Sequence, residues 1–287
     1  MAGYHLMHCI PNPRMHGLNG YKEVIETVAW GLEQLGHRAT YAVNEIASDA
    51  TNIVFGAQVM PITAIRQLPN NTIIYNFEQM RGVQAFQLRE EIRCYAQMRQ
   101  FRIWEYSDAN LPTWRDLGRH DVKIVPVGYA PILNRIPKAP RQDIDVLIYG
   151  LSGERRLQLF HALSTRGLSI LFVSGLYGSA RDDLISRSKV VLNINLYSHA
   201  RIFEIVRVSY LLANKKAVVA DLDLDTITEG DMRTAVKFGR FDQLTDICLR
   251  LVENESERGE LEELGFSAMS KRNIVDILNG ALAAEAA

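Results

Sequence analysis

Short apolar runs alternate with amphipathic stretches along the first half of the chain. The apolar run 4–10 is followed by a stretch in which Val24, Val28 and Leu32 share one helical face, and Gly36 ends that helix. A repeated order of strand, helix and strand predicts a parallel sheet with helices on its faces. The further strand-like runs are 38–43, 51–56, 72–77, 101–107 and 122–128, and the helical candidates are 61–68, 84–99 and 109–118.

Residues 131–144 interrupt this pattern with three prolines and no apolar period, which is the composition of a linker. A second α/β series then begins, with strand-like runs at 145–150, 168–175, 189–195 and 216–221. We therefore expect an α/β protein with two Rossmann-like domains in tandem. The expected division is residues 1–136, residues 137–265, and a C-terminal helix in 266–287, for which packing back on the first domain is one option.

Composition and charge narrow the functional classes. The 32 basic and 33 acidic residues give a net charge of -1, which disfavours a nucleic acid partner but leaves a local basic groove open. The three cysteines are far apart and indicate neither a disulfide framework nor a zinc site, so we expect a cytoplasmic protein. No apolar stretch approaches the roughly 20 residues of a membrane span, and the N-terminus does not resemble a signal peptide.

Two common nucleotide-binding motifs are missing. A dinucleotide enzyme carries G-x-G-x-x-G after its first strand, but residues 11–20 read PNPRMHGLNG and residues 149–156 read YGLSGERR. No P-loop pattern is present either. The sequence therefore disfavours a dinucleotide-dependent dehydrogenase and a P-loop NTPase.

Residues 144–265 resemble the donor-binding domain of GT-B glycosyltransferases, in particular family 1/family 4-like and CgeB-like bacterial enzymes. The resemblance rests on DVLIYGLSGERRLQLFHAL (145–163), KVVLNINLY (189–197), RIFEIVRVSYLLANKKAVVAD (201–221) and the stretch 235–265. It implies two Rossmann-like domains that face each other across a cleft. It also implies a hexosyltransferase-type enzyme that moves a sugar from a UDP or GDP donor to a hydroxyl of a glycan, protein or small molecule, without a metal or cofactor.

The chain departs from this family at two positions. Retaining family 4 enzymes carry two glutamates eight residues apart, but Tyr210 stands at the position that matches the second, and Lys215 replaces the glycine of the following loop. A GT-B-like protein that binds a nucleotide or sugar, or serves as a scaffold, without catalysis is therefore the alternative. A transferase acting on modified DNA is a third reading, which the near-neutral charge disfavours.

Several polar residues of the second half follow predicted strands. Arg155 and Arg156 lie in the first turn of a helix, where free amides and guanidinium groups suit a pyrophosphate; the alternative is that one or both are solvated surface arginines. The resemblance implies that Glu204 binds the ribose diol; the alternative is an ion pair with Arg207 one turn away. Asn195 and His199 follow the strand 189–195 and are further donor-site candidates, although a buried amide bonded to the backbone is the commoner case.

In the first half, the loop HGLNG contains Gly17 and Gly20, which let backbone amides approach a phosphate or sugar. The resemblance implies that this loop faces the donor. His16 is a candidate general base for the acceptor hydroxyl because its ordinary pKa lies near neutrality, and Glu78, which follows the strand 72–77, is an alternative base. The D-x-D spacing of residues 221–225 is typical of metal-dependent GT-A enzymes, but its setting does not match that fold, so we expect no metal site. We expect the charge-rich stretch 253–264 to form a solvated helix face.

Overall fold

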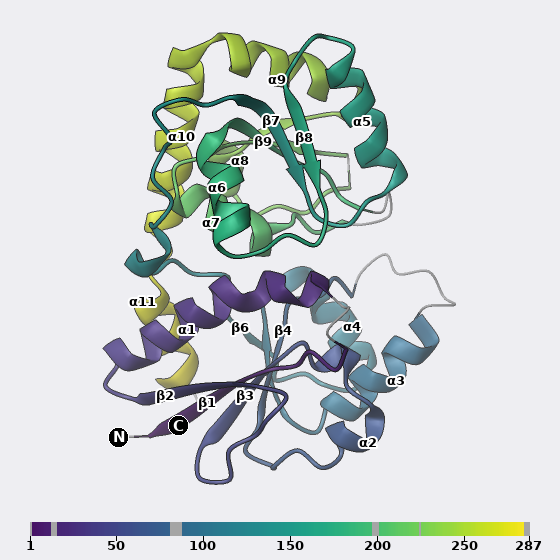
Figure 1. Cartoon of the computed structure of the whole chain (residues 1–287). Helices are drawn as coiled ribbons and strands as arrows, with labels where there is room; N and C mark the ends of the chain where they lie inside the picture. The colour runs from purple at the N-terminus through teal and green to yellow at the C-terminus, as the bar shows by residue number, and fades with distance from the viewer. Residues whose placement is uncertain (1, 13–15, 81–87, 197–200, 224, 284–287) are drawn as a thin grey trace. The chain divides into compact units, whose positions relative to one another are not determined.

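The computed structural model describes residues 2–12, 16–80, 88–196, 201–223 and 225–283, without the side chains of 16–18 and 88–92 (Figure 1). The chain forms two compact units. The first contains residues 1–130 together with 273–287, and the second contains residues 131–272.

The first unit contains a six-stranded sheet among its described residues. Its strands are β1 (Gly3–His8), β2 (Arg38–Val43), β3 (Thr51–Phe55), β4 (Ile73–Asn76), β5 (Arg102–Glu105) and β6 (Lys123–Ile124). Their order is β2-β1-β3-β4-β5-β6, and each neighbouring pair is parallel. The carboxyl ends of all six strands therefore lie at the same edge of the sheet.

Helices complete the first unit, and one of them comes from the end of the chain. α11 packs against α1, where an added Cβ at Gly31 would lie 2.8 Å from Leu278 Cδ1 and 3.0 Å from Ile274 Cγ2. The backbone N–H of Ile274 also donates to the carbonyl of Tyr129 at 3.1 Å. The helical segments are η1 (His16–Tyr21), α1 (Lys22–Gln34), η2 (Ala57–Val59), α2 (Ile62–Ile65), α3 (Leu88–Met98), η3 (Asp108–Asn110), α4 (Leu111–Asp116) and α11 (Ile274–Ala283).

The second unit contains a five-stranded parallel sheet. Its strands are β7 (Ile144–Tyr149), β8 (Ile170–Val173), β9 (Ser188–Asn193), β10 (Ala217–Asp221) and β11 (Lys237–Gly239), in the order β11-β10-β9-β7-β8. Its helical segments are η4 (Pro131–Leu133), α5 (Glu154–Ser164), α6 (Ser179–Arg187), α7 (Ile205–Ala213), α8 (Met232–Ala235), η5 (Phe241–Gln243), α9 (Leu244–Glu253) and α10 (Glu255–Ser270). The α/β class with two Rossmann-like parallel sheets, expected from the sequence, is confirmed.

Both sheets share one topology. In each, the first strand lies between the second and the third, so that the chain changes direction across the sheet between β1 and β3 and again between β7 and β9. Open parallel sheets bind their ligands beyond the carboxyl ends of the strands at such a switch point. The loops that follow these strands are therefore the places to examine for chemistry.

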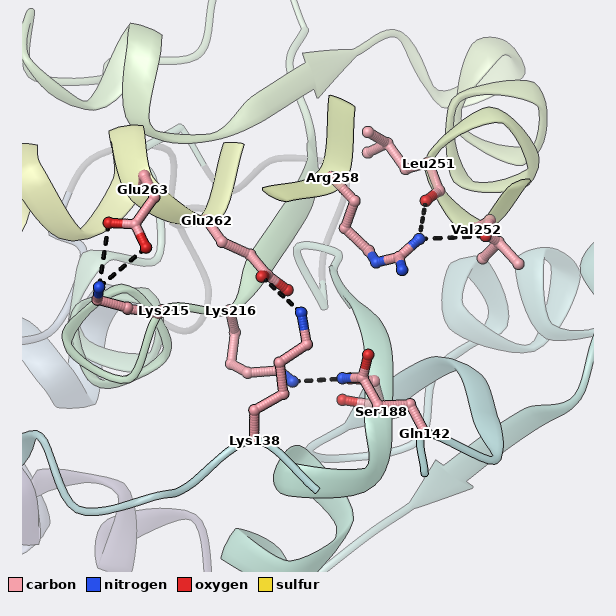
Figure 2. A network of polar contacts seen from close by, with 10 residues as sticks. All are labelled: Lys138, Gln142, Ser188, Lys215, Lys216, Leu251, Val252, Arg258, Glu262 and Glu263. Carbon is pink, nitrogen blue, oxygen red and sulfur yellow. Dashed lines mark hydrogen bonds and ion pairs between the residues drawn. The ribbon is translucent and has the colours of Figure 1, made fainter. Parts of the chain in front are cut away.

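The expectation of a solvated face for residues 253–264 is wrong for two of its charged residues. Arg258 and Glu262 of α10 are buried against the rest of the second unit (Figure 2). Arg258 donates to the carbonyls of Leu251 and Val252 at 2.7 and 3.1 Å, and Glu262 Oε2 accepts from Lys138 at 2.9 Å. These bonds offset part of the cost of burying charge, and the charge pattern alone does not reveal them.

Within the described part of the chain, no helix is both long enough and apolar enough to cross a membrane.

Candidate functional site

The switch point of the second sheet is built around a buried arginine. Arg156 lies in the first turn of α5 and is only 2% exposed. Its Nε and Nη2 donate to the carbonyl of Ile194, just after β9, at 3.0 and 2.7 Å. Its Nη1 donates to the carbonyl of Leu151, just after β7, at 2.6 Å. Arg156 therefore ties together the two loops that flank the switch point.

A second arginine, Arg207, reaches the same place from α7. Its Nη1 donates to Asn193 Oδ1 at 3.2 Å, and its Nη2 lies 3.4 Å from Glu204 Oε2. The guanidinium also lies over the ring of Tyr149, 5.6 Å from its centroid, at the end of β7. Arg207 is partly exposed, so a ligand at the strand ends can contact it.

Gly150 makes room for both guanidinium groups. Its φ is +125°, a conformation that other residues rarely adopt. An added Cβ would lie 2.8 Å from Arg156 Nη1 and 3.2 Å from Arg207 Nη2. A side chain at this position would therefore displace the two arginines.

Arg155 points to the neighbouring strand. Its Nη2 donates to Asp221 Oδ2 at 2.7 Å, and its guanidinium lies over the ring of Phe241, 4.5 Å from the centroid. Asp221 ends β10, and its other oxygen, Oδ1, accepts from the backbone N–H of Asn195 at 3.2 Å. Within the described part of the chain, the buried Nε of Arg155 has no hydrogen-bond partner.

Charged groups of both signs meet at these strand ends. Burial lowers the pKa of Arg156 to about 10, and the neighbouring positive charge of Arg207 acts in the same direction. The negative charges of Glu204 and Asp221 act in the opposite direction. Burial also raises the pKa of Asp221, although the Arg155 guanidinium and the Asn195 amide oppose that shift. Asp223 Oδ2 also lies 4.0 Å from Arg155 Nη2, so three guanidinium groups meet three carboxylates here. The partly exposed guanidinium groups of Arg155 and Arg207 are suited to contact an anion.

Four of the predicted donor-site residues lie together at this edge of the second sheet. Arg156 bonds the residue before Asn195, Asn195 bonds Asp221, and Asp221 bonds Arg155. Glu204 precedes α7 as its N-cap residue and pairs with Arg207, the alternative that the sequence left open. The donor-binding roles of these residues stay predictions.

The segment that carries Glu204 precedes the helix α7. Residues 201–204 are not helical, and Ile202 bridges Ile227 in parallel. The N–H of Phe203 donates to the carbonyl of Ile227 at 2.9 Å, and α7 begins only at Ile205. Glu204 is therefore held at the N-terminus of α7, next to the strand ends.

The remaining predicted site residues either belong to the first unit or lie outside the residues that the structure describes. His199 lies outside the described residues. His16 and Gly17 begin η1, but the His16 side chain lies outside the description, so its role as a base stays a prediction. At Gly20, an added Cβ would meet none of the described atoms within 4 Å.

Glu78 lies just after β4 and takes part in a polar cluster. The hydroxyl of Tyr21 donates to Glu78 Oε1, and Gln58 Nε2 donates to Glu78 Oε1 and to the Tyr21 hydroxyl, both at 3.1 Å. Burial raises the pKa of Tyr21 well above its ordinary value, and the negative charge of Glu78 adds to that shift. The phenol therefore stays a proton donor to Glu78.

The sequence alone offers Arg207 as an ion-pair partner of Glu204 and places Asp221 in a D-x-D spacing that predicts no site. Both lie at the strand ends, as do Asn193 and Tyr149. The position of each residue at or just after a predicted strand was the signal that could have identified Tyr149, Asn193 and Asp221. Arg207 carried no such signal because it lies on the helix α7 and not at the end of a strand.

No family model matches the chain, and no curated protein matches it in sequence. Solved structures do match it. AviGT4, a glycosyltransferase involved in avilamycin A biosynthesis, aligns over 98% of this chain and 96% of its own, with a TM-score of 0.60 and 14% identity. Anabaena Alr3699/HepE in complex with UDP and glucose aligns over 100% of both chains, with a TM-score of 0.62 and 12% identity. T4 phage BGT in complex with its UDP-glucose substrate aligns over 98% of this chain and 99% of its own, with a TM-score of 0.56 and 13% identity.

This chain has the GT-B fold. The narrower resemblance to CgeB-like enzymes stays a prediction. The likeness to these structures extends over nearly the whole chain, whereas the resemblance in sequence was strongest over residues 144–265.

The two departures from the family 4 pattern are visible in this fold. The hydroxyl of Tyr210 donates to Asp182 at 2.9 Å and accepts from Arg135 Nε at 3.0 Å, so this buried side chain serves the packing of the second unit. Lys215 has a φ of +52°, the left-handed conformation in which glycine is favoured. The backbone therefore keeps a glycine-like turn at the position where the side chain differs.

Proposed function

We propose that the chain is a glycosyltransferase that moves a sugar from a nucleoside diphosphate donor, UDP or GDP, to an acceptor hydroxyl of a glycan, a protein or a small molecule. In this proposal the second unit binds the donor. The cytoplasmic location expected from the sequence is part of the same proposal.

The observation that supports it most is the group of three arginines at the switch point of the second sheet. Breaking the bond between sugar and diphosphate develops negative charge on the leaving group, and preorganised cations stabilise that charge. Arg155, Arg156 and Arg207 are already held by Asp221, by two backbone carbonyls and by Asn193. The solved structures of HepE and BGT, in which UDP or UDP-glucose is bound, have the same fold.

The arginines divide into two roles in this proposal. Arg156 donates its hydrogen bonds to the backbone carbonyls of Leu151 and Ile194. It therefore fixes the loops after β7 and β9 and contributes positive charge. Arg155 and Arg207 are more exposed and contact the diphosphate directly. Their positive charge takes the place of a divalent cation, so we propose transfer without a bound metal. Glu204 accepts hydrogen bonds from the ribose hydroxyls.

Glu78 is the proposed general base for the acceptor hydroxyl. It lies at the carboxyl ends of the first sheet, and Tyr21 and Gln58 orient its carboxylate. His16 is the second candidate for this role. Both were proposed from sequence for the chemistry of proton removal, which a carboxylate or a neutral imidazole can perform.

Calorimetric titration with UDP and GDP tests the donor site. We expect one of the two to bind, and we expect Arg207→Gln to weaken that binding by about tenfold or more through the loss of one charged hydrogen-bond partner. Arg166→Gln, on an exposed ion pair with Asp246, is the matched control and should bind normally. If neither nucleotide binds to the wild-type chain, the donor site is wrong.

Turnover separates the proposed enzyme from a binding protein without catalysis. The packing role of Tyr210 favours this second candidate, because the position of the second family 4 glutamate offers no carboxylate. UDP- and GDP-sugars are incubated with the chain, and release of free nucleotide is measured with and without an acceptor library. Nucleotide release supports the enzyme. Binding without release in every condition supports the binding protein.

A further inference from the structure

A buried carboxylate lies next to the turn that carries Glu78. Glu105 ends β5 and pairs in register with Asn76, the last residue of β4. Its side chain is fully buried, and a buried carboxylate is costly unless donors surround it. Four donors do so. Oε2 accepts from Asn76 Nδ2 and Trp114 Nε1, both at 2.8 Å, and Oε1 accepts from Asn110 Nδ2 at 2.9 Å and the backbone N–H of Ser107 at 3.3 Å.

Two of these four donors also hold the turn formed by residues 77–80. The Nδ2 groups of Asn76 and Asn110 donate to the carbonyl of Glu78 at 3.0 and 2.8 Å. At their other ends, Asn76 Oδ1 accepts from the N–H of Glu78 at 3.2 Å, and Asn110 Oδ1 accepts from the N–H of Met80 at 2.8 Å. Both amides therefore bridge Glu105 to the same turn.

The amide group of asparagine fixes which end of each side chain faces Glu105. An asparagine side chain has one end that donates and one that accepts, whereas an ionised carboxylate only accepts. Burial raises the pKa of Glu105 to about 7, and the hydrogen bonds from Trp114, Asn76 and Asn110 oppose that shift. In its ionised form Glu105 requires the Nδ2 end of each asparagine to face it. That choice leaves the two Oδ1 atoms for the backbone N–H groups of Glu78 and Met80, which is the arrangement in the structure.

We infer that Glu105 is a positioning residue that sets the orientation of Asn76 and Asn110 and thereby fixes the turn on which Glu78 is presented to Tyr21 and Gln58. The catalytic consequence rests on the proposed function, in which Glu78 is the base. The effect on the turn does not.

Glu105→Gln tests this inference with the least change in shape. Whichever way the new amide points, its NH₂ group faces donors that the carboxylate accepted, so at least one asparagine loses its partner or reverses. Asn110→Ala is the second variant, because it removes one bridge while Glu105 keeps three of its four donors. Trp114→Phe is the matched control: it removes a donor to the same carboxylate, and among the described residues the Trp114 side chain makes no hydrogen bond to the turn.

Hydrogen–deuterium exchange of the peptide that spans residues 77–80 is the first readout and needs no substrate. We expect exchange to become about tenfold faster or more in Glu105→Gln and in Asn110→Ala, and to stay near the wild-type rate in Trp114→Phe. Unchanged exchange in folded Glu105→Gln, or equal acceleration in all three variants, would overturn the inference. If Glu105→Gln does not fold, the comparison of exchange rates between Asn110→Ala and Trp114→Phe tests the inference.

Kinetics is the second readout. We expect Glu105→Gln to lower kcat about tenfold to a hundredfold through misplacement of Glu78, with the KM for the donor unchanged. In a Glu78→Gln background the same change should lower kcat no further, because both residues act through one carboxylate. A full additional loss there would show a merely structural role and overturn the inference. If Glu78→Gln itself leaves kcat unchanged, Glu78 is not the base; if no transfer occurs at all, the proposed function fails. In both cases the exchange measurement alone decides the role of Glu105.

Discussion

Arg155 donates to Asp221 at the carboxyl end of the second sheet, with 2.7 Å between Nη2 and Oδ2. The aspartate is 4% exposed and the arginine 21%, so the pair lies mostly out of water. The other oxygen of Asp221 accepts from the N–H of Asn195 after β9. One carboxylate therefore holds both the arginine that we propose for the diphosphate and the loop after the neighbouring strand.

This pairing predicts a loss of stability in Asp221→Ala. Removing the carboxylate leaves the guanidinium of Arg155 and the N–H of Asn195 without their acceptors, which we expect to lower the free energy of unfolding by about 2–3 kcal/mol. Urea unfolding of Asp221→Ala, Arg155→Ala and the double variant measures the coupling between the two side chains. Coupling near zero would contradict the pairing.

Comparison of Gly150→Ala with Gly167→Ala should separate the effect of backbone strain from the effect of displacing Arg156 and Arg207. The substitution places a Cβ 2.8 Å from Arg156 Nη1 and forces alanine to a φ of +125°. Gly167→Ala is the control, because Gly167 also has a positive φ, +78°, and an added Cβ there would meet no described atom within 4 Å. We expect both variants to lose about 1 kcal/mol or more of stability.

The two glycine variants should differ in nucleotide binding. We expect Gly150→Ala to bind the nucleoside diphosphate about tenfold more weakly or worse, and Gly167→Ala to bind it normally, because only the first moves Arg156 and Arg207. Calorimetric titration of both variants measures this. Equal affinities would show that the positions of Arg156 and Arg207 do not affect nucleotide binding.

The layout of the fold was predictable from the sequence because it depends on a repeated local pattern. Apolar runs of strand length and amphipathic stretches between them encode both parallel sheets. Helical spacing also predicts the burial of Arg156, because this residue shares the buried face of α5 with Leu159 and Leu163. Arg155, one position earlier, faces Asp221 instead.

Other features of the candidate sites depend on tertiary contacts that no local pattern carries. The four donors around Glu105 come from β4, η3, α4 and the turn after β5, and the sequence does not show that these segments meet. The burial of Arg258 and Glu262 depends in the same way on residues far along the chain.

Lys216 should make stability depend on pH in the alkaline range. Its side chain is buried and its Nζ donates to the carbonyl of Ser188 at 2.7 Å (Figure 2). Burial lowers its pKa from 10.5 to about 8. Between these two values the unfolded chain binds more protons than the folded chain, so stability rises with pH from about 8 to 10.5 and this contribution is constant below 8.

We expect the rise in the free energy of unfolding to be about 3 kcal/mol at most. Lys216→Met keeps the aliphatic length of the side chain and removes the titrating group. Denaturant unfolding of both proteins between pH 7 and pH 11 gives the difference that belongs to Lys216, because other groups titrate equally in the two. A constant difference over this range would show that the Lys216 pKa is not lowered.

Lys215→Gly should stabilise the fold, because Lys215 holds a φ of +52° just after α7, where glycine has no steric penalty. The lysine also pairs with Glu263 at 2.9 Å, but the two side chains are 44% and 65% exposed, and such a pair contributes little. Measured in a Glu263→Gln background, where that pair is already absent, Lys215→Gly should raise the free energy of unfolding by about 0.5–1 kcal/mol. Lower stability in that background would mean that the packing of the lysine chain against Phe266, over whose ring its Nζ lies at 5.0 Å, outweighs the backbone strain.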